Sequence, residues 1–178
     1  MHWTLHAAHG GAETLPASIE AARNDTAVVA LAGPAPVTGP VTEHVLPGPA
    51  GPLRARSYRP LGAGEQGPPL PGIFYFHSGG FVLGGLDSHH SWVSALSNAT
   101  GRIVVAVDYR LAPEHRFPAA AQDAYAAIRH IAGHAPDFGI DVARLSVAGD
   151  SAGANLAGAV NAEVIDAALG IIAGRLHR

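Results

Sequence analysis

The segment 149–153 reads Gly-Asp-Ser-Ala-Gly, a spacing that allows a serine hydroxyl to act as a nucleophile. A short apolar run precedes it at 145–148 and a long apolar helical pattern follows, which together predict a strand, a sharp turn and a helix. Such a turn pushes the hydroxyl out of the sheet edge, and the flanking glycines avoid Cβ collisions. The pattern predicts Ser151 as a nucleophile for acyl transfer, which also needs a base and a carboxylate. The alternative is a glycine-rich turn with an incidental serine.

A second segment, His-Ser-Gly-Gly at 77–80, follows a continuous apolar run. Ester hydrolysis needs backbone N–H groups aimed at the oxyanion that forms during attack. Gly79 and Gly80 let the backbone approach closely, and the residue after the nucleophile, Ala152, supplies a further N–H. We expect these three N–H groups to form an oxyanion hole. The alternative is a tight loop that binds nothing.

Alternating strand and helix patterns surround both segments. Strands are predicted at 42–46, 53–58, 73–76, 103–107 and 144–148, a loop at 60–72, and helices at 13–23, 88–99, 118–130 and 151–172. A Pro/Gly-rich turn between the first two strands predicts an antiparallel hairpin, and alternation in the second predicts a half-exposed strand. The later strands are continuously apolar, which is typical of a parallel sheet buried on both faces. These patterns predict an α/β fold.

Composition excludes several classes of function. The 178-residue chain is 48% hydrophobic and only 14% charged, with a formal net charge of −3 and no basic block. Nucleic-acid and anionic-membrane binding are therefore not expected. The absence of cysteine excludes disulfides and thiolate metal sites. No apolar stretch approaches the roughly 20 residues of a membrane span, and we expect a cytoplasmic protein.

Four segments carry a family resemblance. They lie at 77–84, 108–120, 138–144 and 149–157, and together they resemble the hormone-sensitive-lipase-like branch of α/β hydrolases, the bacterial esterase/lipase group. The resemblance implies the N-terminal part of an α/β-hydrolase fold, with a mostly parallel sheet of about five strands and helices on both faces. It also implies hydrolysis of short-chain carboxylic esters through an acyl-enzyme, with no cofactor and a small-molecule ester as the partner.

The resemblance assigns roles to individual positions. Ser151 matches the nucleophile, and Gly79, Gly80 and Ala152 match the oxyanion donors. Supporting positions in the two motifs are His77, Gly149, Asp150 and Gly153. His77 corresponds to a loop-shaping residue rather than the catalytic base, and Asp150 and Asp108 are expected to organise loops. His89, His90 and His115 are expected to line the pocket.

The chain departs from the family pattern at Ser78, where the family usually has glycine. A positive φ at this serine would cost about 1 kcal/mol. A larger departure concerns the acid and the base, which follow the nucleophile in this fold. Only Glu163, Asp166 and His177 follow Ser151, and at 1.5 Å per helical residue the carboxylates lie about 18 and 22 Å along the helix. We therefore expect the triad Asp and His to be missing.

The predicted domains are an N-terminal arm or cap segment at 1–41 and an incomplete α/β-hydrolase domain at 42–178, ending after the elbow helix. In such a fragment the strand at 144–148 becomes a sheet edge, which favours self-association or complementation by another polypeptide. The isolated chain is expected to be weakly active or inactive. The alternative function is that of a truncated, inactive remnant or an interaction or ligand-binding module.

Overall fold

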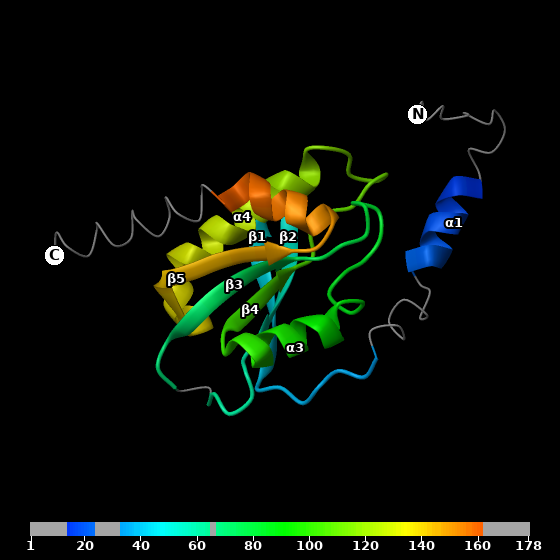
Figure 1. Ribbon diagram of the computed structural model, residues 1–178. Coiled ribbons are helices and arrows are strands. Elements are labelled where there is room, and N and C mark those ends of the chain that lie inside the picture. Colours follow the sequence, from blue (N-terminus) through cyan, green and yellow to red (C-terminus); the bar gives the residue numbers. More distant parts are fainter. Residues whose placement is uncertain (1–13, 24–32, 65–66, 162–178) are drawn as a thin grey trace, which may run out of the picture.

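The computed structural model describes residues 14–23, 33–64 and 67–161, and these form a five-stranded sheet with helices on its two faces (Figure 1). The strands are β1 (Val41–Gly48), β2 (Gly51–Tyr58), β3 (Leu70–Phe76), β4 (Ile103–Val107) and β5 (Ile140–Gly149). The helices are α1 (Thr14–Arg23), α3 (His90–Thr100), α4 (Ala119–Gly133), the 3-10 helix η1 (Ala135–Phe138) and a helical stretch at 152–161.

The sheet has the strand order β1-β2-β4-β3-β5. β1 pairs with β2, and β2 with β4, in antiparallel fashion, whereas β3 runs parallel to both β4 and β5. The predicted five-stranded hydrolase sheet and its antiparallel hairpin are thus confirmed, within a mixed sheet. Phe76 is in register with Val107 on one side and with Gly149 on the other. The segments that follow these three strands therefore emerge at the same edge of the sheet.

The two faces of the sheet are covered by different helices (Figure 1). Phe74 and Phe76 pack in a core with α4 and the helix at 152–161, whereas Ile73 and Tyr75 pack in a second core with Val93 of α3. Side chains alternate across a strand, so a continuous apolar run fills both cores. This arrangement confirms the prediction that β3 is buried on both faces.

The prediction of a half-exposed second strand is wrong. Residues 55–58 of β2 are all buried, because both faces of the strand are covered: Ala55 packs in one core and Tyr58 in the other. The guanidinium of Arg56 is buried in this position and is paired with the carboxylates of Glu43 and Asp87. Alternation of arginine with small residues predicts a solvated face, whereas here the guanidinium is buried and two exposed carboxylates neutralise its charge.

Two strands begin earlier than the sequence patterns predict. Leu70 and Pro71, which were expected in a loop, pair with Ile140 and Asp141. Residues 70–71 and 140–141 adopt strand conformation because they pair with each other, although neither segment has a strong strand pattern by itself. Tertiary context therefore sets these two boundaries.

Substitution of Asp123 by alanine is expected to destabilise the fold by about 2–3 kcal/mol. This carboxylate on α4 is 1% exposed. It accepts hydrogen bonds from the backbone N–H of Arg110 at 2.9 Å and from its guanidinium Nε at 2.8 Å. Removal of the carboxylate leaves the backbone N–H and the guanidinium of Arg110 without this hydrogen-bond acceptor. Urea unfolding measures the loss, and Asp137→Ala, at an exposed carboxylate, serves as the control, with no expected change. Equal stability of both variants would contradict this account.

Candidate active site

The G-x-S-x-G segment forms the predicted strand–turn–helix. β5 ends at Gly149, Ser151 follows with a φ of 51°, and the helix begins at residue 152. A Cβ atom at Gly153 would lie 1.9 Å from the carbonyl oxygen of Phe76, and one at Gly149 would lie 2.4 Å from Gly153. Both positions therefore require glycine, as the sequence predicts. The turn leaves Ser151 exposed in a strained backbone conformation.

The loop after β3 forms a tight turn. Gly79 and Gly80 have φ values of 122° and 62°, and the carbonyl of Gly79 accepts hydrogen bonds from the N–H groups of Val82 at 3.0 Å and Leu83 at 2.8 Å. A Cβ atom at Gly79 would lie 2.0 Å from the carbonyl oxygen of Leu83. Ser78 does not have a positive φ, so the strain considered for this serine does not arise.

The glycine loop and the elbow turn are packed against each other. A Cβ atom at Gly153 would meet the carbonyl oxygen of His77 at 2.8 Å as well as that of Phe76. Within the described part of the chain, the backbone N–H groups of Gly79, Gly80 and Ala152 donate no hydrogen bond. The structure therefore brings these predicted donors to the same sheet edge as Ser151, with N–H groups free to bind an oxygen.

His77 is held rigidly inside this edge. It is 2% exposed, its ring stacks on Tyr109 with centroids 4.3 Å apart, and its Nδ1 lies 2.7 Å from the carbonyl oxygen of Ser78. The hydroxyl of Tyr109 donates to the carbonyl of His77 at 2.7 Å. Burial lowers the pKa of His77 to about 4, so its ring is neutral at neutral pH and Nδ1 donates to the carbonyl. These contacts fit a residue that shapes the loop.

The low pKa of His77 predicts a pH-dependent stability. Between the unperturbed His value of 6.5 and the folded value of about 4, the unfolded chain binds a proton that the folded chain does not. The free energy of unfolding is therefore expected to fall as the pH is lowered through this window, by up to about 3 kcal/mol, and to lose its dependence on His77 below it. Urea unfolding of the wild type and of His77→Phe between pH 4 and 7 tests this. A slope that persists unchanged in the variant contradicts the assignment.

Asp150, in the elbow turn, contacts side chains from β3 and from the loop before α3. Its Oδ1 accepts a hydrogen bond from the Tyr75 hydroxyl at 2.5 Å, and its Oδ2 lies 3.9 Å from Nε2 of His89. Burial raises the pKa of Asp150, but hydrogen bonds from Tyr75 and Ser78 and the nearby His89 together lower it below its ordinary value. Sequence reasoning missed Tyr75, because a tyrosine in an apolar strand gives no sign that its hydroxyl reaches a carboxylate.

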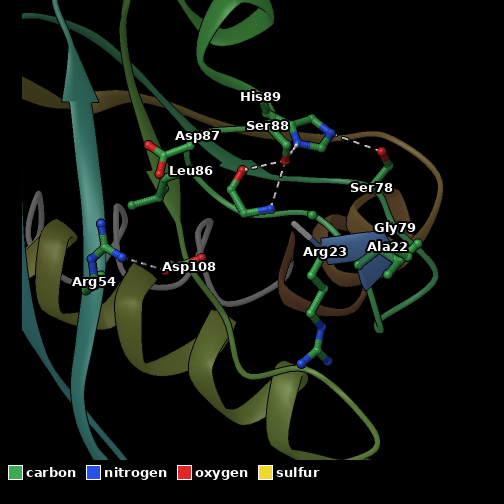
Figure 2. A pocket seen from close by; sticks show the side chains of 13 residues that line it. Ala22, Arg23, Arg54, Ser78, Gly79, Leu86, Asp87, Ser88, His89 and Asp108 are labelled. Carbon is green, nitrogen blue, oxygen red and sulfur yellow. Dashed lines mark hydrogen bonds and ion pairs between the residues drawn. The ribbon is translucent and has the colours of Figure 1, made fainter. Parts of the chain in front are cut away.

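The three flanking histidines have different surroundings. His89 lines a cavity of about 310 Å³ together with Ser78 and Gly79 (Figure 2). His115 lines a second, mostly apolar cavity of about 530 Å³, beside Gly80. His90 instead contacts the hydroxyl of Tyr58, at 3.2 Å. Asp108 lies 3.6 Å from the Arg54 guanidinium.

Arg23 ties helix α1 to the loops at this edge. Its guanidinium donates to the carbonyls of Val82 at 2.7 Å and Ala112 at 2.8 Å, and it forms an ion pair with Glu114 at 2.7 Å. Arg23 also lines the 310 Å³ cavity. The sequence predicted the helix but gave no signal for this anchor, since its partners lie 59 to 91 residues away.

Other sequence-predicted residues lie outside the described part of the chain. These are Glu163, Asp166 and His177. The described residues after Ser151 contain neither a carboxylate nor a histidine. Among the described residues, no group of three or more His, Cys, Asp or Glu side chains is placed to hold a metal ion, and no helix is long and apolar enough to cross a membrane.

Comparison with known proteins gives consistent matches. Residues 73–176 match the family described as alpha/beta hydrolase fold. Esterase LipI of Mycobacterium tuberculosis is 46% identical over 120 residues, which cover 67% of this chain and 37% of that protein. Ethyl acetate hydrolase of Pseudomonas putida is 46% identical over 107 residues, covering 59% of this chain and 33% of that protein. The solved esterase of Pyrobaculum calidifontis superposes with a TM-score of 0.71 at 42% identity, over 80% of this chain and 45% of that one. The chain thus spans about a third of the length of these curated relatives.

Proposed function

Because the chain belongs to the α/β hydrolase fold family, in its hormone-sensitive-lipase-like branch of bacterial esterases, we propose that it acts as a carboxylic ester hydrolase with Ser151 as the nucleophile. One observation carries the proposal. Ser151 stands exposed with a φ of 51° at the end of β5, beside the loop whose N–H groups at Gly79 and Gly80 are free of hydrogen bonds within the described residues.

The proposed reaction follows from this arrangement. The Ser151 oxygen attacks the carbonyl carbon of the ester, and the carbonyl oxygen becomes an oxyanion that accepts hydrogen bonds from the N–H groups of Gly79, Gly80 and Ala152. The C–O bond to the alcohol breaks, the alcohol leaves with the proton that the Ser151 hydroxyl loses, and the acyl group stays on Ser151. Water then hydrolyses the acyl-enzyme and releases the acid.

The base and the acid of this reaction are not among the described residues that follow Ser151. We propose that they come from outside the described part, and we expect slow turnover by the 178-residue chain alone. Oxyanion donors and substrate binding by themselves accelerate such reactions by about 10³–10⁴ over water. Slow but measurable hydrolysis is the expected behaviour.

We propose esters of short acyl chains as the substrates. Relatives of the chain include an ethyl acetate hydrolase and acetyl esterases. The mostly apolar cavity of about 530 Å³ adjoins Gly80 and the elbow helix at Leu156, and Phe81 lines it. An apolar cavity next to an oxyanion hole suits the hydrocarbon part of a small ester.

Hydrolysis of a series of p-nitrophenyl esters by the purified chain tests the proposed function. The acetate and butyrate are expected to be hydrolysed above the buffer rate, and the decanoate more slowly, in line with the relatives that are named for acetyl esters. Heat-unfolded chain provides the matched background. Rates at the buffer level for every ester would contradict an esterase function.

A second candidate function is binding without catalysis. Among the described strands, β5 pairs only with β3 and so forms one edge of the sheet. Free edges pair readily with other strands, which favours self-association or complementation by another polypeptide. Light scattering on a size-exclusion column measures the mass in solution. A monomer at micromolar concentration that also hydrolyses esters would contradict this alternative.

We also propose that the N-terminal segment 1–41 serves as part of a cap over the site. The contacts of Arg23 with the loop carbonyls of Val82 and Ala112 support this role, since they tie α1 to loops beside the glycine turn. The remainder, 42–178, then constitutes the hydrolase unit.

A further inference from the structure

A second serine lies beside a histidine, outside the G-x-S-x-G segment. The Ser78 hydroxyl is 3.0 Å from Nε2 of His89, and Nδ1 of the same ring is 2.9 Å from the hydroxyl of Ser88 (Figure 2). The ring therefore lies between two serine hydroxyls. A nucleophile in reach of a base that a third group orients is the arrangement that activates a serine.

The hydrogen bonds of Ser88 determine which ring nitrogen carries the proton. Its hydroxyl accepts from the N–H of Gly85 at 3.0 Å and donates to the carbonyl of the same residue at 3.0 Å. Because its single proton is used, Ser88 accepts from His89. We therefore assign the proton to Nδ1, which leaves Nε2 as a second acceptor, beside the Asp150 carboxylate, for the Ser78 hydroxyl. This is the tautomer that a general base requires.

The surroundings of the pair are suited to a small ligand. Ser78, Gly79, Ser88 and His89 all line the cavity of about 310 Å³, and the His89 side chain is 15% exposed. The Asp150 carboxylate lies 3.9 Å from Nε2 of His89 and also accepts a hydrogen bond from the Ser78 hydroxyl. Gly79 is the residue after Ser78, and its free N–H can donate a hydrogen bond to an oxyanion.

We propose that Ser78 is a second serine nucleophile, with His89 as its base, for esters of small acyl groups that fit this cavity. The Ser78 oxygen attacks the ester carbonyl carbon while its proton passes to Nε2 of His89. The C–O bond to the alcohol breaks, and the alcohol leaves with that proton. The acyl group remains on Ser78 until water, deprotonated by His89, hydrolyses it. This proposal does not depend on Ser151 as a nucleophile.

Covalent labelling with a small alkyl fluorophosphonate tests the proposal, because this probe reacts with activated serines. The label is mapped by digestion and mass spectrometry in the wild type, in Ser151→Ala, and in Ser151→Ala combined with His89→Gln. Ser151→Ala combined with His134→Gln is the matched control, since this exposed histidine lies at the end of α4. Circular dichroism melts establish that each variant is folded.

The expected result is label on Ser78 in Ser151→Ala, at a rate at least tenfold lower with His89→Gln and unchanged with His134→Gln. Label on Ser151 of the wild type but none on Ser78 overturns this inference and leaves the proposed function standing. Label on neither serine counts against both. Label on Ser78 at the same rate with His89→Gln overturns the assignment of the base. Ser78→Gly in the Ser151→Ala background confirms the site by abolishing the signal, and a signal that survives it contradicts the proposal.

Discussion

Alanine in place of Gly153 is expected to destabilise the protein by more than about 3 kcal/mol. The added Cβ would lie 1.9 Å from the carbonyl oxygen and 2.5 Å from the carbonyl carbon of Phe76, and 2.8 Å from the carbonyl oxygen of His77. All of these atoms belong to the backbone at the end of β3, so no side-chain rotation relieves the clash. Either the elbow helix moves away from β3 or the strand is distorted. Urea unfolding, or failure to purify a folded chain, measures the effect.

Gly158→Ala is the matched control for this prediction. Gly158 lies on the same helix, is exposed, and has no atom within 4 Å of the position that its Cβ would take. Alanine there is expected to stabilise by about 0.5–1 kcal/mol, because glycine is a poor helix former. Similar stabilities of the Gly153 and Gly158 variants would mean that the elbow does not pack as described.

Substitution of Ser151 by alanine is expected to remove the covalent route of ester hydrolysis that passes through Ser151. The rate with p-nitrophenyl acetate should fall below the slow rate of the wild type by at least about tenfold, because no acyl-enzyme forms at residue 151 without the hydroxyl. The fold should survive, because serine and alanine are similar in size and the side chain is exposed. Steady-state kinetics of both chains, at matched concentration and with matched circular dichroism, measure the difference.

Ser146→Ala is a suitable control for the Ser151 variant. Ser146 lies on β5, the strand that precedes Ser151, and its hydroxyl donates to the carbonyl of Gly72 rather than lying in the elbow turn. Its removal should leave the rate unchanged. Equal rates in the wild type and Ser151→Ala would contradict a nucleophilic role and favour the reading of the chain as a binding module or inactive remnant.

The elbow turn and the glycine loop could be predicted from sequence because residues adjacent in the chain determine the backbone conformation of each. A strand, two glycines and a helix within 149–153 restrict the backbone so strongly that the turn follows, and Ser151 has the expected strain. The glycine loop at 79–80 follows a strand for the same reason. These two loops were expected to lie close together because parallel strands end at the same edge of a sheet.

The long-range contacts of the site could not be predicted in this way. The hydrogen bond of Tyr75 to Asp150 joins residues 75 positions apart, and the ion pair of Arg23 with Glu114 joins residues 91 positions apart. Arg56 was expected at the surface because an arginine is costly to bury. Its two carboxylate partners come from other segments, and only the folded chain brings them together. Patterns along the sequence show the periodicity of helices and strands, but they do not show which distant residues form hydrogen bonds or ion pairs with each other.

The acyl-enzyme itself gives the most direct test of the central claim that Ser151 is the nucleophile. The chain is incubated with p-nitrophenyl acetate, quenched in acid, digested and analysed by mass spectrometry. We expect an acetyl group on the peptide that contains Ser151, and its absence from that peptide in Ser151→Ala. Without a base among the described residues after Ser151, deacylation should be slow and the adduct should accumulate. Release of p-nitrophenolate with no acetyl group on Ser151 would contradict the account.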